Sequence, residues 1–148
     1  MNKPKLIVIV GLPGSGKTYN LKSHVRDHNV VYHVDSFKKN AHDHSSRFWS
    51  SRHLADLLRH LIARETCLIT DIHFCRPDAR EEAESFLRAC FPDIDICWLF
   101  QENAPDKCER NIRRSREEVM NRLNKLAEFR DQYDIPPGAE VRPVYDGG

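Results

Sequence analysis

Residues 11–18 read Gly11-Leu12-Pro13-Gly14-Ser15-Gly16-Lys17-Thr18, and this stretch decides the fold. It matches the pattern G-x-x-x-x-G-K-[ST], in which glycines let backbone N–H groups turn inward around phosphate oxygens. The apolar run Leu6–Val10 precedes it and predicts a strand buried on both faces. A helix is expected from about Gly16 to Asp27, so that its N-terminus faces the same anion. The sequence therefore predicts a strand, a phosphate-binding loop and a helix in the order that this motif requires.

The residue types in this loop predict its ligand. We expect ATP to be bound through its phosphates by Gly11, Pro13, Gly14, Ser15, Gly16, Lys17 and Thr18. Lys17 would reach the β- and γ-phosphates, and Thr18 would place its hydroxyl on Mg²⁺. A chance match in a chain of this size occurs on the order of once in a few hundred, given average glycine usage. A glycine-containing turn without a ligand is therefore the weaker interpretation.

Length and composition are those of one ordinary domain spanning residues 1–148. Of the 148 residues, 40% are hydrophobic and 30% are charged, and the net charge is +1. This balance gives no global argument for nucleic acid or membrane, so any basic site must be local. No apolar run reaches the length of a membrane span. The five cysteines include no C-x-x-C pair, which favours a reducing cytoplasm over a disulfide framework or zinc site; we expect them to be small buried hydrophobes.

Strand and helix signals alternate along the rest of the chain. Further strands are expected at Val30–Val34, Cys67–Thr70, Ile94–Phe100 and Glu140–Tyr145, and helices after Arg47, after Pro77 and over 105–133 with a break near Arg114–Arg116. This order predicts an α/β fold, the three-layer sandwich of P-loop NTPases, with a parallel sheet of four to five strands and helices on both faces. Ligands of such sheets bind at the carboxyl ends of the strands.

Two aspartates follow predicted strands, as Gly11 does. Asp71 ends the strand Cys67–Thr70, where a carboxylate can hold Mg²⁺ or its waters opposite Thr18. Asp35 ends the second strand, where a carboxylate can orient an acceptor hydroxyl and accept its proton. Either aspartate could instead only cap the turn that follows it.

An arginine cluster follows the strand Ile94–Phe100. Its members are Arg110, Arg113, Arg114 and Arg116, and the first three share one side of the predicted helix. An arginine can stabilise the charge on a phosphoryl group in transfer, and Arg110 and Arg114 are our candidates for this catalytic role. The alternative is a solvated basic face paired to neighbouring glutamates. Which arginine contacts the phosphates stays open.

These residues together resemble the P-loop kinase domain of polynucleotide 5′-hydroxyl kinases, and more broadly the small P-loop kinases around it. The likeness runs along nearly the whole chain: residues 11–18, Tyr32–Lys38, the strand end at Asp71, Leu99-Phe100, and Arg110-Asn111 with Arg114. The resemblance implies that Asp35 is the general base, that Lys38 touches an acceptor phosphate, that Asp71 organises acceptor or metal, and that Arg114 contacts the donor phosphates from a lid.

The chain departs from that family at the acceptor side. Val34-Asp35-Ser36 stands where polynucleotide kinases tend to carry Arg-Asp-Asp, and Lys38 replaces an arginine, which removes bidentate phosphate recognition. After Asp71 the family favours Thr-Asn, whereas Ile72-His73 follows here. These departures leave the catalytic interpretation in place and bear on the choice of a polynucleotide acceptor.

The stretch 37–53 interleaves basic and aromatic residues, as in a site that grips phosphate and stacks a base. Its members are Phe37, Lys38, Lys39, His42, His44, Arg47, Phe48, Trp49, Arg52 and His53. We expect Phe48 and Trp49 to be core residues of the following helix. The positive charges fit an anionic or phosphorylated acceptor. His42 and His44 lack a third ligand pattern and are more typical of solvated histidines than of a metal site.

Three functions remain in competition. The leading prediction is an ATP-dependent kinase acting on a hydroxyl, with a polynucleotide 5′-OH end as the preferred acceptor. The others are a small-metabolite or nucleotide kinase of the same fold, and a nucleotide-binding regulator that phosphorylates nothing. Asp35 separates the last from the first two, because a regulator needs no acceptor base. The sequence leaves open the acceptor, the choice of ATP over GTP, and the oligomeric state.

Overall fold

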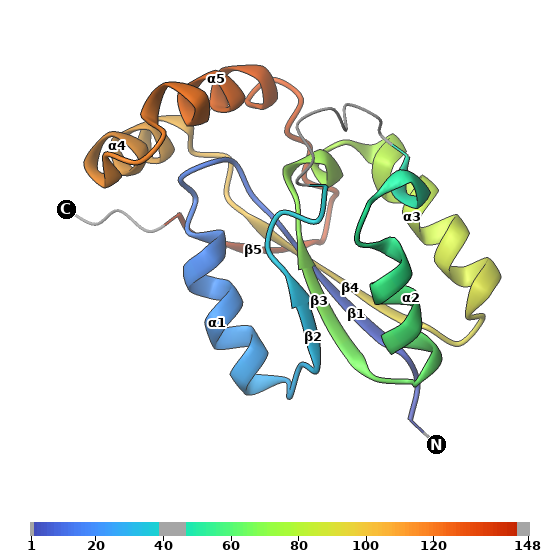
Figure 1. Cartoon of the computed structure of the whole chain (residues 1–148). Helices are drawn as coiled ribbons and strands as arrows, with labels where there is room; N and C mark the ends of the chain where they lie inside the picture. The colour runs from blue at the N-terminus through green and yellow to red at the C-terminus, as the bar shows by residue number, and fades with distance from the viewer. Residues whose placement is uncertain (1, 39–46, 145–148) are drawn as a thin grey trace.

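The computed structural model describes residues 2–38 and 47–144. Its strands form one parallel sheet in the order β2-β3-β1-β4-β5 (Figure 1). The strands are β1 (Lys5–Val10), β2 (Tyr32–Val34), β3 (Thr66–Thr70), β4 (Asp95–Gln101) and β5 (Glu140–Arg142). Each pair of neighbours is parallel. The predicted α/β class is confirmed, with five strands in the sheet.

Helices cover both faces of this sheet. They are α1 (Lys17–Asp27), α2 (Leu54–Ile62), α3 (Pro77–Cys90), α4 (Pro105–Ser115) and α5 (Val119–Phe129), with two short 3₁₀ turns, η1 (Phe48–Ser50) and η2 (Ile72–Cys75). Figure 1 shows α1 on one face, α2 and α3 on the other, and α4 with α5 over the edge where the strands end. The predicted helix break is present, because Arg116 adopts a left-handed conformation with φ of 58° between α4 and α5.

Strand β1 explains why the chain needs helices on both faces. Its residues are almost fully buried, as expected for a central parallel strand. Leu6, Val8 and Val10 belong to the larger core cluster, which includes residues of α2 and α3. Ile7 and Ile9 belong to a smaller cluster with Leu21 of α1. Because side chains alternate along a strand, this one apolar run supplies both cores.

The register of the sheet aligns the carboxyl ends of its central strands. Ile9 is paired with Thr70 of β3, and Val10 with Phe100 of β4. The segment after α5 is then fastened to this edge, because the Tyr133 hydroxyl lies 2.6 Å from the carbonyl oxygen of Gln101 and 3.0 Å from that of Val10. The fold thus brings the helices α4 and α5 over the strand ends where the phosphate-binding loop begins.

Not every apolar side chain on the helices is buried. Ile62 is 70% exposed, because α2 ends at that residue. On α5, Ala127 is exposed and Phe129 is buried in its place. The cysteines do not all behave as buried hydrophobes, since Cys90 at the end of α3 is exposed and Cys97 is half-buried. Among the described residues, no helix combines the length and apolar character needed to cross a membrane.

Candidate active site

The phosphate-binding loop connects β1 to α1 and depends on its glycines. Gly14 has φ of 82° and Gly16 has φ of 90°, values that L-residues with a side chain rarely adopt. A Cβ atom at Gly14 would lie 2.5 Å from the carbonyl oxygen of Cys108 and 2.9 Å from Cγ1 of Ile112. The loop therefore packs directly against α4 at Gly14, an approach that the motif alone does not reveal.

The interior of the loop fits a phosphate group. The Ser15 hydroxyl is buried, with the residue 1% exposed, and it has no hydrogen-bond partner among the described residues. Helix α1 begins after Gly16 without a side-chain cap and has no acidic residue in its first turn. A buried hydroxyl usually has a partner, and uncapped N–H groups at a helix start favour anions. Both features are explained if phosphate oxygens are bound here.

Lys17 is placed for the same ligand. Burial lowers the pKa of its ammonium below the ordinary value, while the carboxylates of Asp71 and Asp35 act in the opposite direction. A buried cation that is short of compensating charge gains most from an anion brought beside it. The loop thus presents a cation, a hydroxyl and a helix N-terminus to one phosphate group, which is the combination that a nucleoside triphosphate requires.

Asp35 lies directly beside the phosphate-binding loop. Its Oδ2 accepts a hydrogen bond of 2.8 Å from the Thr18 hydroxyl, and its Oδ1 accepts one of 2.6 Å from the Thr70 hydroxyl. The residue is exposed and lines the cleft. Thr18 and Asp35, 17 positions apart, thus present a hydroxyl and a carboxylate together, which is an oxygen donor set that suits Mg²⁺ and its waters.

Asp71 has a different environment, although it too follows a strand. It is 3% exposed, and its Oδ2 accepts a hydrogen bond of 2.7 Å from the Lys38 backbone N–H. Its Oδ1 accepts from the His73 backbone N–H at 2.8 Å and lies 2.5 Å from Nδ1 of the same residue. Burial would raise the pKa of this carboxyl, but the bonds from His73 and Lys38 outweigh it and hold the pKa below its usual range. Asp71 is therefore a buried anion that organises its neighbours.

A cleft of about 1070 Å³ runs between the loop and the helices α4 and α5. Of the predicted site residues, Pro13, Gly14, Ser15, Gly16, Lys17, Thr18, Asp35, Lys38, Asp71 and Arg114 line it. Gly11 is buried beneath the loop, and Arg110 lies exposed on α4 and is not among the lining residues. The predicted phosphate-binding and acceptor residues thus line a single cleft. Of the two candidate arginines, Arg114 lines it and Arg110 does not.

Arg114 is tied to the phosphate-binding loop through Asn111. The Asn111 amide donates a hydrogen bond of 2.9 Å to the carbonyl oxygen of Gly14, and Arg114 Nη2 donates to Oδ1 of the same amide. The residues are three positions apart on α4, so both reach the cleft. Sequence patterns alone assigned no role to Asn111. The feature that could have indicated one is its position three residues before Arg114 on the same predicted helix.

Helix α5 supplies further polar groups that the sequence analysis missed. Asn121, Arg122, Lys125 and Glu128 all line the cleft opposite the phosphate-binding loop. Their spacing of three and four places them on one helical face, a polar stripe that could have been found from periodicity. At the end of this stripe the Phe129 ring meets the His73 ring edge-on, with centroids 5.3 Å apart. Helix α5 therefore contacts His73, the residue that is hydrogen-bonded to Asp71.

The predicted acceptor residues are only partly described. Lys38 is 4% exposed, and its Nζ lies 5.7 Å from the centroid of the Phe74 ring. Lys39, His42 and His44 lie outside the described residues. Within residues 2–38 and 47–144, no group of three or more His, Cys, Asp or Glu side chains could hold a metal ion.

The expectation that Phe48 and Trp49 are both core residues is half wrong. Phe48 is fully buried and stacks on Phe37 with ring centroids 5.3 Å apart. Trp49 is 46% exposed, because it lies on the outer side of the single turn η1. Helical periodicity predicted burial for both, but the helix α2 begins only at Leu54.

Comparison with known proteins agrees with this geometry. A family model described as an AAA domain matches residues 6–135. The chain belongs to this AAA domain family. It is 23% identical over 148 residues to an uncharacterized protein of Acanthamoeba polyphaga mimivirus, covering 95% of this chain and 97% of the other. The family assignment agrees with the phosphate-binding loop at residues 11–18.

Similar solved structures are small P-loop proteins. A gluconokinase from Sinorhizobium meliloti aligns with a TM-score of 0.67 and 16% identity, over 97% of this chain and 85% of that one. Chaetomium thermophilum Kti12, solved with ADP-AlF3, gives a TM-score of 0.58, and Mycobacterium tuberculosis APS kinase, solved with AMPPNP and APS, gives 0.56. Each of these two shares 16% identity and covers 97% of this chain and 90% of its own. The chain has the fold of small P-loop kinases.

Proposed function

We propose that this protein is an ATP-dependent kinase that transfers the γ-phosphoryl group to a hydroxyl acceptor, with a polynucleotide 5′-OH end as the acceptor. The observation that carries the proposal is the carboxylate of Asp35, held 2.8 Å from the hydroxyl of Thr18 at the mouth of the phosphate-binding loop. A regulator that only binds nucleotide could use this carboxylate for Mg²⁺ and its waters, but it has no acceptor hydroxyl for the carboxylate to orient. A kinase needs a carboxylate within reach of the transferring group.

The side chains that surround the phosphates have separable tasks. Lys17 from the loop and Arg114 from α4 neutralise charge that builds up on the transferring oxygens. Asn111 holds Arg114 in place through its bond to Gly14. The backbone N–H groups at the start of α1 and the Ser15 hydroxyl bind the remaining phosphate oxygens. These groups are fixed before the reaction, so they stabilise the transition state without rearrangement.

Asp35 orients the acceptor hydroxyl and accepts its proton. The acceptor oxygen forms a bond to the γ-phosphorus, the bond to the β–γ bridging oxygen breaks, and ADP leaves with that oxygen. Thr18 would hold Mg²⁺, which supplies neutralisation of phosphate charge when it is bound. Asp71 is part of the outer shell in this scheme, because both of its oxygens accept bonds from the protein. It sets the positions of Lys38 and His73.

A small hydroxyl compound is the second candidate acceptor. The observation in its favour is the fold itself, since the similar structures include a gluconokinase and an APS kinase solved with APS. The departures around Asp35 and Asp71 point the same way. A nucleic-acid end is preferred because Lys38 lines the cleft and basic residues follow it in the chain.

The test is transfer of labelled γ-phosphate from ATP, with Mg²⁺, to a short single strand bearing a 5′-hydroxyl. We expect labelled strand from the wild type, and loss of label in Asp35→Asn with ATP binding retained. Asp56→Asn is the matched control, because Asp56 lies on α2, bonds to Arg59 and does not line the cleft. Unchanged transfer in Asp35→Asn would remove Asp35 as the base. Bound ATP without labelled strand would refute the nucleic-acid acceptor and favour a small one.

A further inference from the structure

Trp49 is an exposed aromatic residue in the short turn η1, close in sequence to the cleft residue Lys38. It is 46% exposed, whereas its neighbour Phe48 is fully buried. The guanidinium carbon of Arg47 lies over its ring, 4.8 Å from the centroid. Because Trp49 stays exposed although Arg47 covers part of its ring, the indole has room for a second stacking partner. The exposed part of the indole ring is the kind of aromatic surface on which a nucleic-acid base stacks.

The chain on either side of Trp49 is basic. The stretch from Arg47 to His53 contains two arginines and one histidine and no carboxylate. Arg47 and Arg52 are exposed, and His53 is partly exposed. Cations placed around an aromatic face are the combination that binds single-stranded nucleic acid, since bases stack on the ring and phosphates contact the cations.

Short contacts fix this surface to the cleft. Phe48 stacks on Phe37 at 5.3 Å with ring planes 13° apart, and the Ser51 hydroxyl donates a hydrogen bond of 3.1 Å to the Phe37 carbonyl oxygen. Phe37 lies between Ser36 and Lys38, which both line the cleft. The turn that carries Trp49 is therefore one layer of side chains away from the acceptor end.

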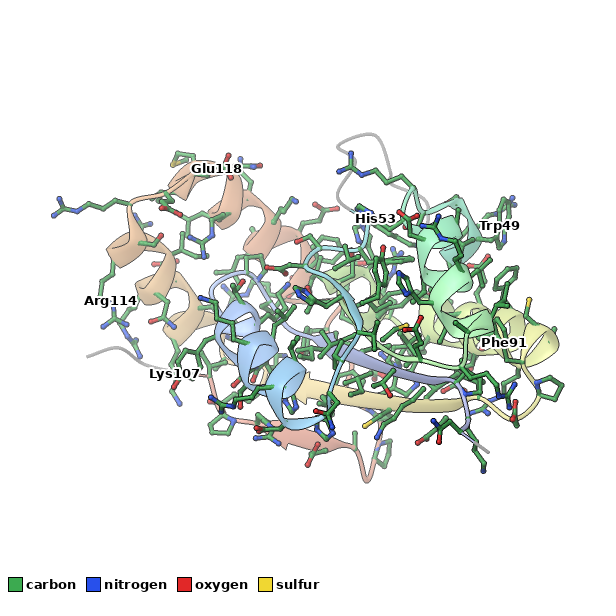
Figure 2. The ribbon with its side chains drawn as sticks, turned by 60° about the horizontal axis from the view of Figure 1, so that its bottom comes forward. Trp49, His53, Phe91, Lys107, Arg114 and Glu118 are labelled. Atoms are coloured by element: carbon green, nitrogen blue, oxygen red, sulfur yellow. The ribbon has the colours of Figure 1, made fainter. Side chains whose placement is uncertain are left out.

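The surface and the nucleotide-binding arginine lie on different sides of the molecule. Figure 2 shows Trp49 and His53 on the side that carries α2, while Arg114 and Glu118 lie across the molecule on the side that carries α4 and α5. Arg114 belongs to the nucleotide side, through its link to Gly14. The turn η1 is therefore on the side away from the nucleotide.

We propose that Arg47, Trp49, Arg52 and His53 form a docking surface for single-stranded nucleic acid, which binds the nucleotides that follow the 5′ end held in the cleft. Trp49 stacks a base, and the two arginines contact backbone phosphates. This inference rests on the proposed kinase function with a nucleic-acid acceptor, and it adds a length preference. A strand that spans the cleft and the surface is a better acceptor than one that fills the cleft alone.

Tryptophan fluorescence tests binding independently of catalysis. The chain has two tryptophans, and Trp98 is bonded through Nε1 to Glu84 at 2.6 Å, so Trp98→Phe leaves Trp49 as the reporter. An oligothymidylate of about twelve nucleotides is the probe, a length within the site sizes of single-strand binding surfaces. We expect saturable quenching that weakens as salt rises, since phosphate contacts release counterions. Absence of quenching by the strand would overturn the proposal. Quenching that depends on protein concentration and not on the strand would also overturn it, in favour of self-association.

Phosphoryl transfer to acceptors of two lengths tests the role of the surface. With Trp49→Ala, kcat/KM for the long 5′-OH strand should fall about tenfold, the value of one lost stacked base, while kcat/KM for a 5′-OH dinucleotide stays unchanged. Arg52→Ala should lower only the long-strand value as well. Ile62→Ala is the control, because Ile62 is 70% exposed on the same side of the sheet but at the far end of α2.

The two assays separate this inference from the proposed function. Quenching of Trp49 without transfer to either acceptor would refute the nucleic-acid acceptor of the proposed kinase and leave strand binding by this surface in place. Transfer that Trp49→Ala lowers equally for both lengths would overturn the surface and leave the kinase. Equal kcat/KM for the two lengths in the wild type would also overturn it.

Discussion

Gly14→Ala tests the packing of the phosphate-binding loop against α4. Gly14 has φ of 82°, and an L-residue in the left-handed region costs about 1–2 kcal/mol. The added Cβ would also lie 2.5 Å from the Cys108 carbonyl oxygen, a backbone atom that cannot rotate away. Relieving such an overlap typically costs a further ~1–3 kcal/mol. We therefore expect the free energy of unfolding in urea to fall by about 2–5 kcal/mol, a large part of the stability of a domain this size.

Gly138→Ala is the matched control for this variant. Gly138 has φ of 79°, but a Cβ there would meet nothing within 4 Å. Its loss should be the backbone cost alone, about 1–2 kcal/mol, and ATP binding measured by calorimetry should not change. Gly14→Ala should also weaken ATP binding, because the loop must move away from α4 and from Asn111. Equal losses of stability in the two variants would refute the close approach of loop and helix.

Three further outcomes follow from the buried polar groups. Lys17→Met should abolish ATP binding and yet raise stability in urea, because burial lowers the pKa of Lys17 and the fold carries the cost of that charge. Tyr133→Phe should cost about 1–3 kcal/mol in thermal or urea unfolding, because the carbonyls of Val10 and Gln101 lose their donor. Burial acts to raise the pKa of Asp71, but hydrogen bonds lower it overall in the folded protein. The ionised carboxylate therefore stabilises the fold fully above the unfolded pKa. This stabilisation is lost as pH falls through the lower folded pKa. Asp71→Asn should accordingly flatten the dependence of stability on pH below about pH 4.

The parts of the fold that the sequence predicts are those set by local patterns. The run Leu6–Val10 and the loop after it require a buried strand followed by a helix, and the structure has both. Local patterns failed where an element was too short to have a period. Trp49 lies in a turn of three residues, so its exposure depends on how Phe48 packs beneath it. The exposure of Cys90 has another cause, because Cys90 is the last residue of α3.

The contacts that shape the site connect residues far apart in the chain. Asn111 donates to Gly14 across 97 positions, and Tyr133 reaches Val10 across 123. No spacing rule relates such residues, because the crossing of α4 over the sheet edge brings them together. The position of Arg114 on a helix near the nucleotide follows from the sequence. The link from this arginine through the Asn111 side chain to the loop does not.

The two strand-end aspartates show how environment divides similar residues between roles. Both follow parallel strands, and the sequence does not show how buried each one is. Asp35 is exposed and accepts from two hydroxyls, Thr18 and Thr70, which can each rotate to other partners. Asp71 is buried and accepts from backbone N–H groups, which cannot. A group that must exchange partners during a reaction needs the first environment, and a group that must hold a cleft in shape needs the second. The difference in hydrogen-bond donors is therefore what favours Asp35 as the residue that meets the acceptor.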